Sequence, residues 1–466
     1  MKYKICAGAI GFLASTSLIH GMTSNNYFDA LPIYSTANPH EFLYDFGKDI
    51  MRGLKSEQKD ERFNFTITPF GQRSKRAKDI DQEEIQLGNI HGLWNMLALT
   101  YTTCPTSSSL GTNLAAAAAQ EYACNPTGTD TPLYFNDDTA FTYTAVICNT
   151  GSNFGQVEVP AEYRRYGVRF ETAIMLLEDL GFKAQFGVSD LQFTVTAFRD
   201  NNGTGCGEAT CEGTNQRNVY RLLTSEDKIH DIASEIGLNI NNFHKTSFED
   251  MRLQLFWRHA VEVNQDRNGW SQFLFMPFIQ LIGTIATGPE KDPSIQFAVS
   301  HGNNGHHAFG INTGFTLDFD DRVEIGFEAG GTVFMDRTVC NLRIPNHKEQ
   351  SGIFPCTTTA CISPGANWHF LATIHARHFL RRLSFFIQYA QVNHQADTIR
   401  VADSTLGFIP SMLEKQSKWN QRYFLSSLHY DISPNVNAGI LWQAPLSSNR
   451  NAPRIGGLYG TVAVNF

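Results

Sequence analysis

A long β-hairpin pattern in residues 307–334 constrains this chain more than any other feature. The odd positions from 309 to 319 and from 323 to 333 are mostly apolar, and the even positions between them are polar or small. Because successive side chains of a strand point to opposite faces, this period of two predicts two strands joined by a turn. Pairing odd with odd positions needs an odd number of loop residues. The sequence therefore predicts a three-residue turn, Asp320–Arg322, or a five-residue one.

These two predicted strands are long enough to cross a membrane. Each keeps its alternation for about a dozen residues, whereas an ordinary strand has roughly 5–6 and a tilted membrane-spanning strand needs roughly 9–11. The polar face carries Asp318, Glu324 and Glu328. A charge turned toward lipid costs up to a few kcal/mol at the bilayer midplane. We therefore expect the apolar face to meet lipid, although a soluble sandwich with that face in its core would show the same alternation.

The N-terminus has the pattern of a secretory signal peptide. Residues 1–21 begin with Lys2 and Lys4, continue with an apolar stretch and end at the small residue Gly21. The alternative, a membrane anchor, is disfavoured because the apolar stretch is too short to span a bilayer comfortably. After this segment nothing approaches the roughly eighteen uncharged apolar residues of a helical span. Any membrane crossing must then use strands.

The same alternation recurs along the chain and predicts the number of strands. From Tyr163 to the C-terminus we expect eleven strands, in which short turns alternate with long loops. This asymmetry is typical of a barrel with one tight periplasmic rim and one rim of extracellular loops. Residues 62–71 add a strand, and residues 86–102 are compatible with strand or helix. Because bacterial barrels usually have even strand numbers, we favour fourteen, with twelve and sixteen left open.

The predicted organisation is one all-β, transmembrane, antiparallel up-and-down barrel. Residues 22–61 form a tail, a plug or an additional strand, and residues 62–466 form the barrel. The fourteenth strand would lie in 27–50 or 133–147, and a helix is expected near Ser225–Ile236. Whether the first long loop folds into the lumen is left open. The long loops are predicted at 103–160, 200–246, 284–306, 335–365 and 393–418.

Composition agrees with a barrel and argues against several functions. Charged residues make up 18%, below the roughly 25% of soluble domains, and Phe is abundant at 35 residues. The net charge of −8 argues against a nucleic-acid partner. We find no nucleophile motif, phosphate-binding loop or dinucleotide fingerprint, so the sequence predicts no enzyme activity and no cofactor.

Eight cysteines follow the predicted signal, all in predicted loops, in groups of three, two and three. An even number in an exported chain suggests disulfides. If all eight pair and the middle two form a local bridge, the first and third groups must share a bridge. Zinc is the alternative, but its paired ligand spacing is missing. The cysteines are Cys104, Cys124, Cys148, Cys206, Cys211, Cys340, Cys356 and Cys361.

Charged residues on the predicted inner face are the candidate functional residues. Both signs occur, which suits a water-filled lumen that passes small polar solutes; cross-strand salt bridges that only satisfy the wall are the alternative. The candidates are Arg165, Arg169, Glu171, Asp250, Arg252, Arg258, Arg322, Glu324, Glu328 and Arg377.

Histidines and aromatic residues suggest weaker assignments. His301, His306 and His307 lie in a Gly/Asn-rich loop, where we expect solvated turn residues rather than a metal site. Aromatic residues near predicted strand ends fit interfacial girdles, with ordinary packing as the alternative. They are Tyr166, Trp368, Tyr430 and Trp442.

The last strand resembles the terminal strand of bacterial outer-membrane β-barrel proteins. It ends in an aromatic residue preceded by apolar residues at alternate positions, namely Leu458, Val462, Val464 and Phe466. The resemblance implies an outer-membrane location, contact with lipid and recognition of this strand by the barrel-assembly machinery. The loop cysteines resemble those of the cysteine-bearing major outer-membrane porins, and the fatty-acid transporter barrels are similar in expected size. Homo-oligomerisation is left open.

Three functions compete at this point. The first is a porin-like channel for passive diffusion of small hydrophilic solutes, motivated by the charged inner face. The second is a structural or adhesive surface barrel whose disulfide-tied loops carry the function. The third is an outer-membrane enzyme, for which the sequence shows no catalytic constellation.

Overall fold

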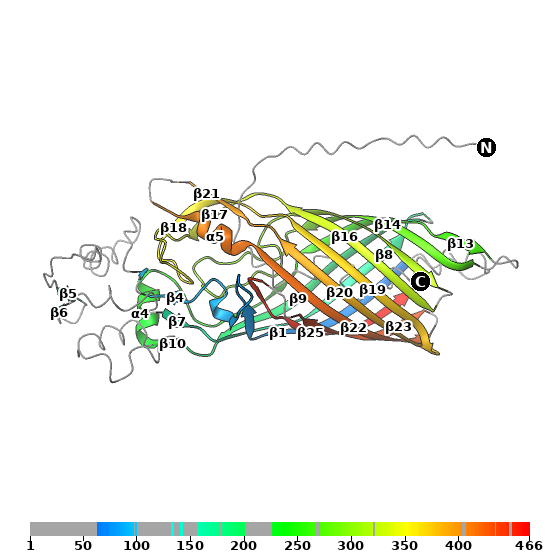
Figure 1. Cartoon of the computed structure of the whole chain (residues 1–466), viewed down its shortest axis with the longest axis horizontal. Helices are drawn as coiled ribbons and strands as arrows, with labels where there is room; N and C mark the ends of the chain where they lie inside the picture. The colour runs from blue at the N-terminus through cyan, green and yellow to red at the C-terminus, as the bar shows by residue number, and fades with distance from the viewer. Residues whose placement is uncertain are drawn as a thin grey trace.

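A closed antiparallel β-barrel forms the body of the protein (Figure 1). The computed structural model describes residues 63–96, 98–99, 132–134, 140–142, 156–177, 179–200, 226–265, 271–319, 322–402, 407–433, 435–446 and 450–466. Within these residues twelve strands follow one another around the barrel, and the last pairs with the first. They are β1 (Phe63–Ser74), β8 (Ala161–Met175), β9 (Leu180–Val195), β12 (Met251–Arg258), β14 (Ser271–Ile285), β15 (Ala308–Phe319), β16 (Val323–Phe334), β19 (Asn367–Leu380), β20 (Leu383–His394), β22 (Trp419–Ser433), β23 (Val436–Pro445) and β25 (Gly456–Asn465).

The closed barrel has twelve strands rather than the favoured fourteen. The eleven strands expected after Tyr163 and the strand expected at 62–71 are all present. Two further strands belong to the same sheet, β11 (Phe243–Phe248) and β13 (Val261–Gln265). They add no strand to the count, because β11 pairs with β9 and β13 pairs with β14, the two strands that flank β12.

The segments expected to supply further strands do not join the barrel. Residues 86–96 contain a single 3-10 turn, η2 (Leu87–Asn89), and the two-residue strand β4 (Trp94–Asn95). In the 133–147 region, β5 (Pro132–Tyr134) pairs with β6 (Ala140–Thr142) in a separate small sheet. Residues 27–50 lie outside the described residues.

The organising hairpin has the predicted register and faces. Phe319 pairs with Val323, which leaves the three-residue turn as predicted. Phe315 lies opposite Phe327 with ring centroids 5.5 Å apart, on the outer face. On the inner face, Glu324 is 3% exposed, whereas Phe327 is 39% exposed. The alternation therefore assigned both faces correctly.

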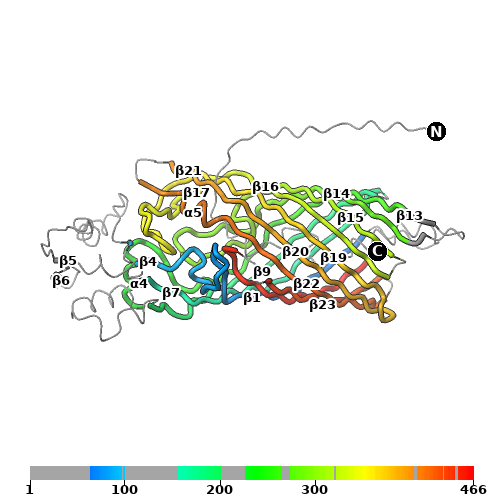
Figure 2. Tube along the Cα trace, in the orientation of Figure 1, coloured from blue at the N-terminus to red at the C-terminus, as the bar shows by residue number. Residues whose placement is uncertain are grey.

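The two ends of the barrel differ as the sequence predicted. One end has short turns, including the one after β15, and the other gathers the long loops with helices α4 and α5 (Figures 1 and 2). The helix expected near Ser225–Ile236 is α4. The elements at this loop end are α4 (Glu226–Glu235), α5 (Pro410–Ser417), β2 (Arg76–Lys78), β3 (Glu84–Gln86), β7 (Gln156–Glu158), β10 (Arg199–Asp200), β17 (Arg337–Arg343), β18 (Thr357–Ser363), β21 (Thr398–Val401) and β24 (Ala452–Pro453).

The outer face of the barrel carries large exposed apolar side chains on successive strands. A closed barrel with an apolar outside and a polar inside is the architecture of outer-membrane β-barrel proteins. The four predicted girdle residues, Tyr166, Trp368, Tyr430 and Trp442, are about half exposed on this face. Phe466 is also exposed, and its backbone pairs with Phe63. Among the described helices, none is long and apolar enough to cross a membrane.

The predicted signal peptide and tail lie outside the described residues, as do five of the eight loop cysteines. Of the remaining three, Cys356 is disulfide-bonded. Cys340 and Cys361 carry free thiols, so these two depart from the expected full pairing. The disulfide framework of the loops stays a prediction.

Replacing Phe327 with arginine should make the free energy of membrane insertion less favourable by roughly 2–4 kcal/mol. The reason is that Phe327 lies on the outer face of β16, near the middle of the strand. Tyr430→Arg, near a strand end, should cost roughly 0–1 kcal/mol. Equilibrium unfolding from lipid vesicles measures both. Equal losses at the two positions would contradict the assignment of this face to lipid.

Candidate functional site

The predicted inner-face charges do converge inside the barrel, with one exception. Nine of the ten are buried on the face opposite the exposed apolar side chains. The exception is Arg322, which is exposed. It was assigned to the inner face by extending the alternation, but it lies in the turn, where its backbone bonds to Phe319 and Arg377. The nine are Arg165, Arg169, Glu171, Asp250, Arg252, Arg258, Glu324, Glu328 and Arg377.

Glu249 joins two arginines of β8 in a deeply buried ionic cluster. Its carboxylate accepts hydrogen bonds from Arg165 Nη2 (2.8 Å) and from Arg169 Nε (2.6 Å) and Nη2 (3.1 Å). The guanidinium of Arg169 also lies 4.2 Å from the ring centroid of Phe70. Charge-assisted hydrogen bonds of this kind are the strong ones in a dry interior. The cluster therefore ties β8 to the segment between β11 and β12 across the inner wall.

Glu249 is not among the predicted inner-face residues because a β-bulge between β11 and β12, one extra residue relative to β9, interrupts the alternation. Glu249 and Asp250 are consecutive, between β11 and β12, and both are buried. In a regular strand two successive residues face opposite ways, but a bulge turns both to one side. A continuous alternation through Met251 places Glu249 on the outer face. The only available signal was the energetic cost of a carboxylate in lipid.

Other interior charges are also paired across strands. Lys183 Nζ lies 2.5 Å from Glu171, and Arg377 Nε lies 2.8 Å from Glu324. The sequence alone allows two roles for such charges, namely lining a water-filled lumen or neutralising one another in the wall. Among the described residues these charges are paired and almost wholly removed from solvent. Charges that line an open aqueous pore would instead remain hydrated.

The loop between β14 and β15, residues 286–307, folds into the mouth of the barrel and is called the inward loop below. Its backbone is anchored by Asp250, whose carboxylate accepts hydrogen bonds from Gly288 N (3.0 Å) and Asn303 N (2.5 Å). A Cβ at Gly302 would lie 2.2 Å from this carboxylate, so only glycine fits there. One wall carboxylate thus holds the loop at two points.

Apolar packing completes the closure at the loop end. Phe297 of the inward loop stacks on Phe193 of the inner wall (centroids 5.2 Å apart) and on Trp94 (5.7 Å). Trp94 is fully buried, and its segment is held by Ser351, whose backbone oxygen accepts from Asn95 N (3.2 Å). Residues 87–96, the inward loop and residues 344–356 therefore form a packed cap. The cap packs against the inner wall at the loop end of the barrel.

Of the three loop histidines, His307 is exposed, as expected for a solvated turn residue, whereas His301 and His306 are not. His301 and His306 are 0% and 1% exposed, because the inward loop folds into the barrel. His301 Nε2 bonds to Lys245 O (3.0 Å), and His306 Nδ1 bonds to Met335 O (2.8 Å). Burial lowers the pKa of His306 below its ordinary value, which keeps it neutral at physiological pH. Among the described residues no group of ligands fits a metal ion.

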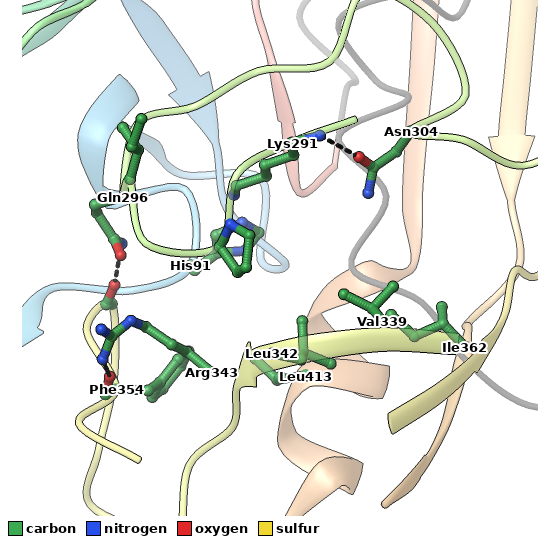
Figure 3. Close-up of a pocket in the computed structure, with 13 residues that line it drawn as sticks. His91, Lys291, Gln296, Asn304, Val339, Leu342, Arg343, Phe354, Ile362 and Leu413 are labelled. Carbon is green, nitrogen blue, oxygen red and sulfur yellow. Dashed lines mark hydrogen bonds between the residues drawn. The ribbon is translucent and has the colours of Figure 1, made fainter. Parts of the chain in front are cut away.

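A cavity of about 90 Å³ lies in the cap. Figure 3 shows His91 and Lys291 on one side of it and Val339, Leu342 and Leu413 on the other. Its walls come from four parts of the chain, namely the segment before β4, the inward loop, the β17–β18 region and α5.

No protein-family model and no curated protein matches the chain. Among solved structures it is similar to an outer membrane channel from Pseudomonas putida F1, at 6% identity and a TM-score of 0.44, over 87% of this chain and 96% of that one. The toluene transporter TbuX of Ralstonia pickettii is similar at 10% identity and a TM-score of 0.31, over 87% and 89%. The NanC porin is similar at 8% identity and a TM-score of 0.29, over 65% and 93%. At these identities the likeness concerns the barrel architecture alone.

Proposed function

We propose that the protein is a gated outer-membrane channel for small polar or charged solutes. The observation that carries this proposal is the inward loop, which closes a charged barrel interior and is anchored on the wall through Asp250. Two backbone hydrogen bonds to one carboxylate are a local attachment, which can be released without unfolding a strand. Release of the loop would uncover the interior charges from the loop end.

The proposal differs from the freely permeable porin in one respect. Free diffusion requires a hydrated path at rest, whereas the interior ion pairs of Glu249 with Arg165 and Arg169 are buried. In the gated channel these same pairs form the surface along which a solute passes once the loop has moved. Channels commonly use rings of charged side chains in this way.

Single-channel recording in planar bilayers tests the proposal, with folding checked by heat-modifiable gel mobility. We expect rare openings of uniform size from the wild-type protein, and more frequent ones when the loop anchor is weakened. A folded, inserted protein that stays silent in both forms would contradict a channel function.

The packed cap favours a second candidate, a barrel whose surface loops carry the function. Trp94, Phe297 and Ile353 belong to one continuous apolar core with the wall, which suits a permanently closed structure. Deleting part of the extracellular loops should then abolish surface adhesion or weaken the envelope while conductance stays absent. Unchanged adhesion and envelope integrity would remove this candidate.

A further inference from the structure

The cap cavity contains a cation for which the described residues provide no counter-ion. The backbone N of Lys291 donates to Asn304 Oδ1 (2.7 Å), but no carboxylate of the described residues pairs with its ammonium group. Burial without a counter-charge lowers the pKa of Lys291 to about 8, so the group is still mostly protonated at pH 7. Lys291 is partly buried, and a cation withdrawn from water is costly unless an anion completes the site.

The neighbouring polar groups also suit an anion. Nδ1 of His91 is buried without a hydrogen-bond partner in the described part of the chain. Burial, and secondarily the charge of Lys291, lowers the pKa of His91 to about 4, so His91 is neutral at pH 7 and can donate a hydrogen bond. Arg343 adds positive charge, although its Nη1 and Nη2 groups already donate to backbone carbonyls, including those of Phe354 and Gly237.

The opposite wall of the cavity is apolar. Val339, Leu342, Ile362 and Leu413 lie across from His91 and Lys291 (Figure 3). A volume of about 90 Å³ holds roughly six to nine water-sized groups. With an inorganic anion bound, the apolar wall would still be in contact with water. With a neutral apolar molecule bound, the ammonium group of Lys291 would still have no counter-ion. A compact molecule with an anionic head and an apolar body matches both walls.

We propose that this cavity binds a small organic carboxylate, with its carboxylate against Lys291 and His91 and its apolar body against Val339, Leu342 and Leu413. Lys291 belongs to the inward loop, whereas Leu342 and Leu413 belong to β17 and α5, so the ligand bridges the loop that closes the barrel and the elements outside it. Carboxylate binding in the cavity does not depend on the proposed function. Only the idea that such carboxylates are solutes of the channel rests on it.

Isothermal titration of the full-length protein in detergent micelles tests the site, with benzoate as the probe and benzyl alcohol and inorganic phosphate as comparisons. We expect saturable binding of benzoate and at least tenfold weaker binding of the other two. Lys291→Met should weaken benzoate binding at least tenfold, and Lys348→Met, at a lysine that is 80% exposed in the same cap, should not. Equal affinity for benzyl alcohol, stronger binding of phosphate, or unchanged binding by Lys291→Met would overturn the proposal.

The pH dependence gives an independent readout. Lys291 loses its proton above about pH 8, so benzoate affinity should fall about tenfold per unit above that pH. The other titratable groups lining the cavity, His91 and Arg343, have pKa values of about 4 and about 10 and do not titrate between pH 5 and 9. Affinity that stays constant up to pH 9 would count against the ammonium contact. Because binding is measured at equilibrium, a silent barrel that binds benzoate would refute the channel and leave this site standing.

Discussion

Replacing Asp250 with alanine is expected to raise the open probability of the barrel by roughly ten- to hundredfold. The carboxylate holds the inward loop through the backbone N–H groups of Gly288 and Asn303, and a hydrogen bond to a charged group contributes roughly 1.5–3 kcal/mol. Losing even one such contribution shifts the balance between docked and released loop by that factor. The measurement is open probability in planar bilayers, at matched numbers of inserted molecules.

Two further variants separate loop release from general damage. Asp292→Ala removes a carboxylate of the same loop that bonds only locally, to Ser294, and should leave the channel closed. Gly302→Ala changes the loop instead of the wall, and its added Cβ would collide with the carboxylate of Asp250. It should therefore raise the open probability as Asp250→Ala does. If Asp250→Ala and Gly302→Ala are folded but as quiet as Asp292→Ala, the inward loop does not gate the barrel.

The second large effect is expected at Glu249, where substitution should destabilise the fold. Glu249→Gln keeps the shape of the side chain but leaves Arg165 and Arg169 without the carboxylate that neutralises them in a dry interior. Breaking a buried ion pair from one side costs roughly 3–5 kcal/mol. Denaturant unfolding in lipid vesicles, followed by tryptophan fluorescence, measures this loss of the free energy of unfolding.

Glu162 supplies the matched control. It also pairs with two arginines, Arg73 and Arg164, but their side chains are 55% and 43% exposed. Glu162→Gln should therefore cost far less, because hydrated arginines do not need a carboxylate to offset their burial. A similar loss of the free energy of unfolding in Glu249→Gln and Glu162→Gln would contradict the argument that burial of the arginines makes Glu249 important.

The strands and their faces could be predicted because a strand has a period of two and one face meets lipid. This rule located β15, β16 and most of the inward charges without any information on contacts. It failed where the chain leaves the rule, at the bulge of Glu249 and at the turn of Arg322. At Glu249 two successive side chains share one face, and at Arg322 the chain has left the strand. The sequence carries no periodic mark of either change.

The cap could not be predicted for a different reason. The inward loop is irregular, so no period reports its burial, and its contacts with Trp94 and Asp250 join residues far apart in the chain. Gly302 and Asn303 suggested only a turn, whereas the structure uses the missing side chain of Gly302 to bring the backbone against Asp250. Sequence patterns describe local conformation well, but the direction in which a loop folds is decided by distant partners.

The seam between β1 and β25 has a consequence for how the barrel assembles. Asn64 bonds to Asn465 across 401 positions of chain, whereas most neighbouring strands are joined by hairpins or single loops. Bringing such distant ends together costs roughly 4 kcal/mol more chain entropy than closing a turn of about four residues. Hairpins such as β15–β16 should therefore form early, as local units. The β1–β25 pairing is then the last to form during folding and the first to break under denaturing conditions.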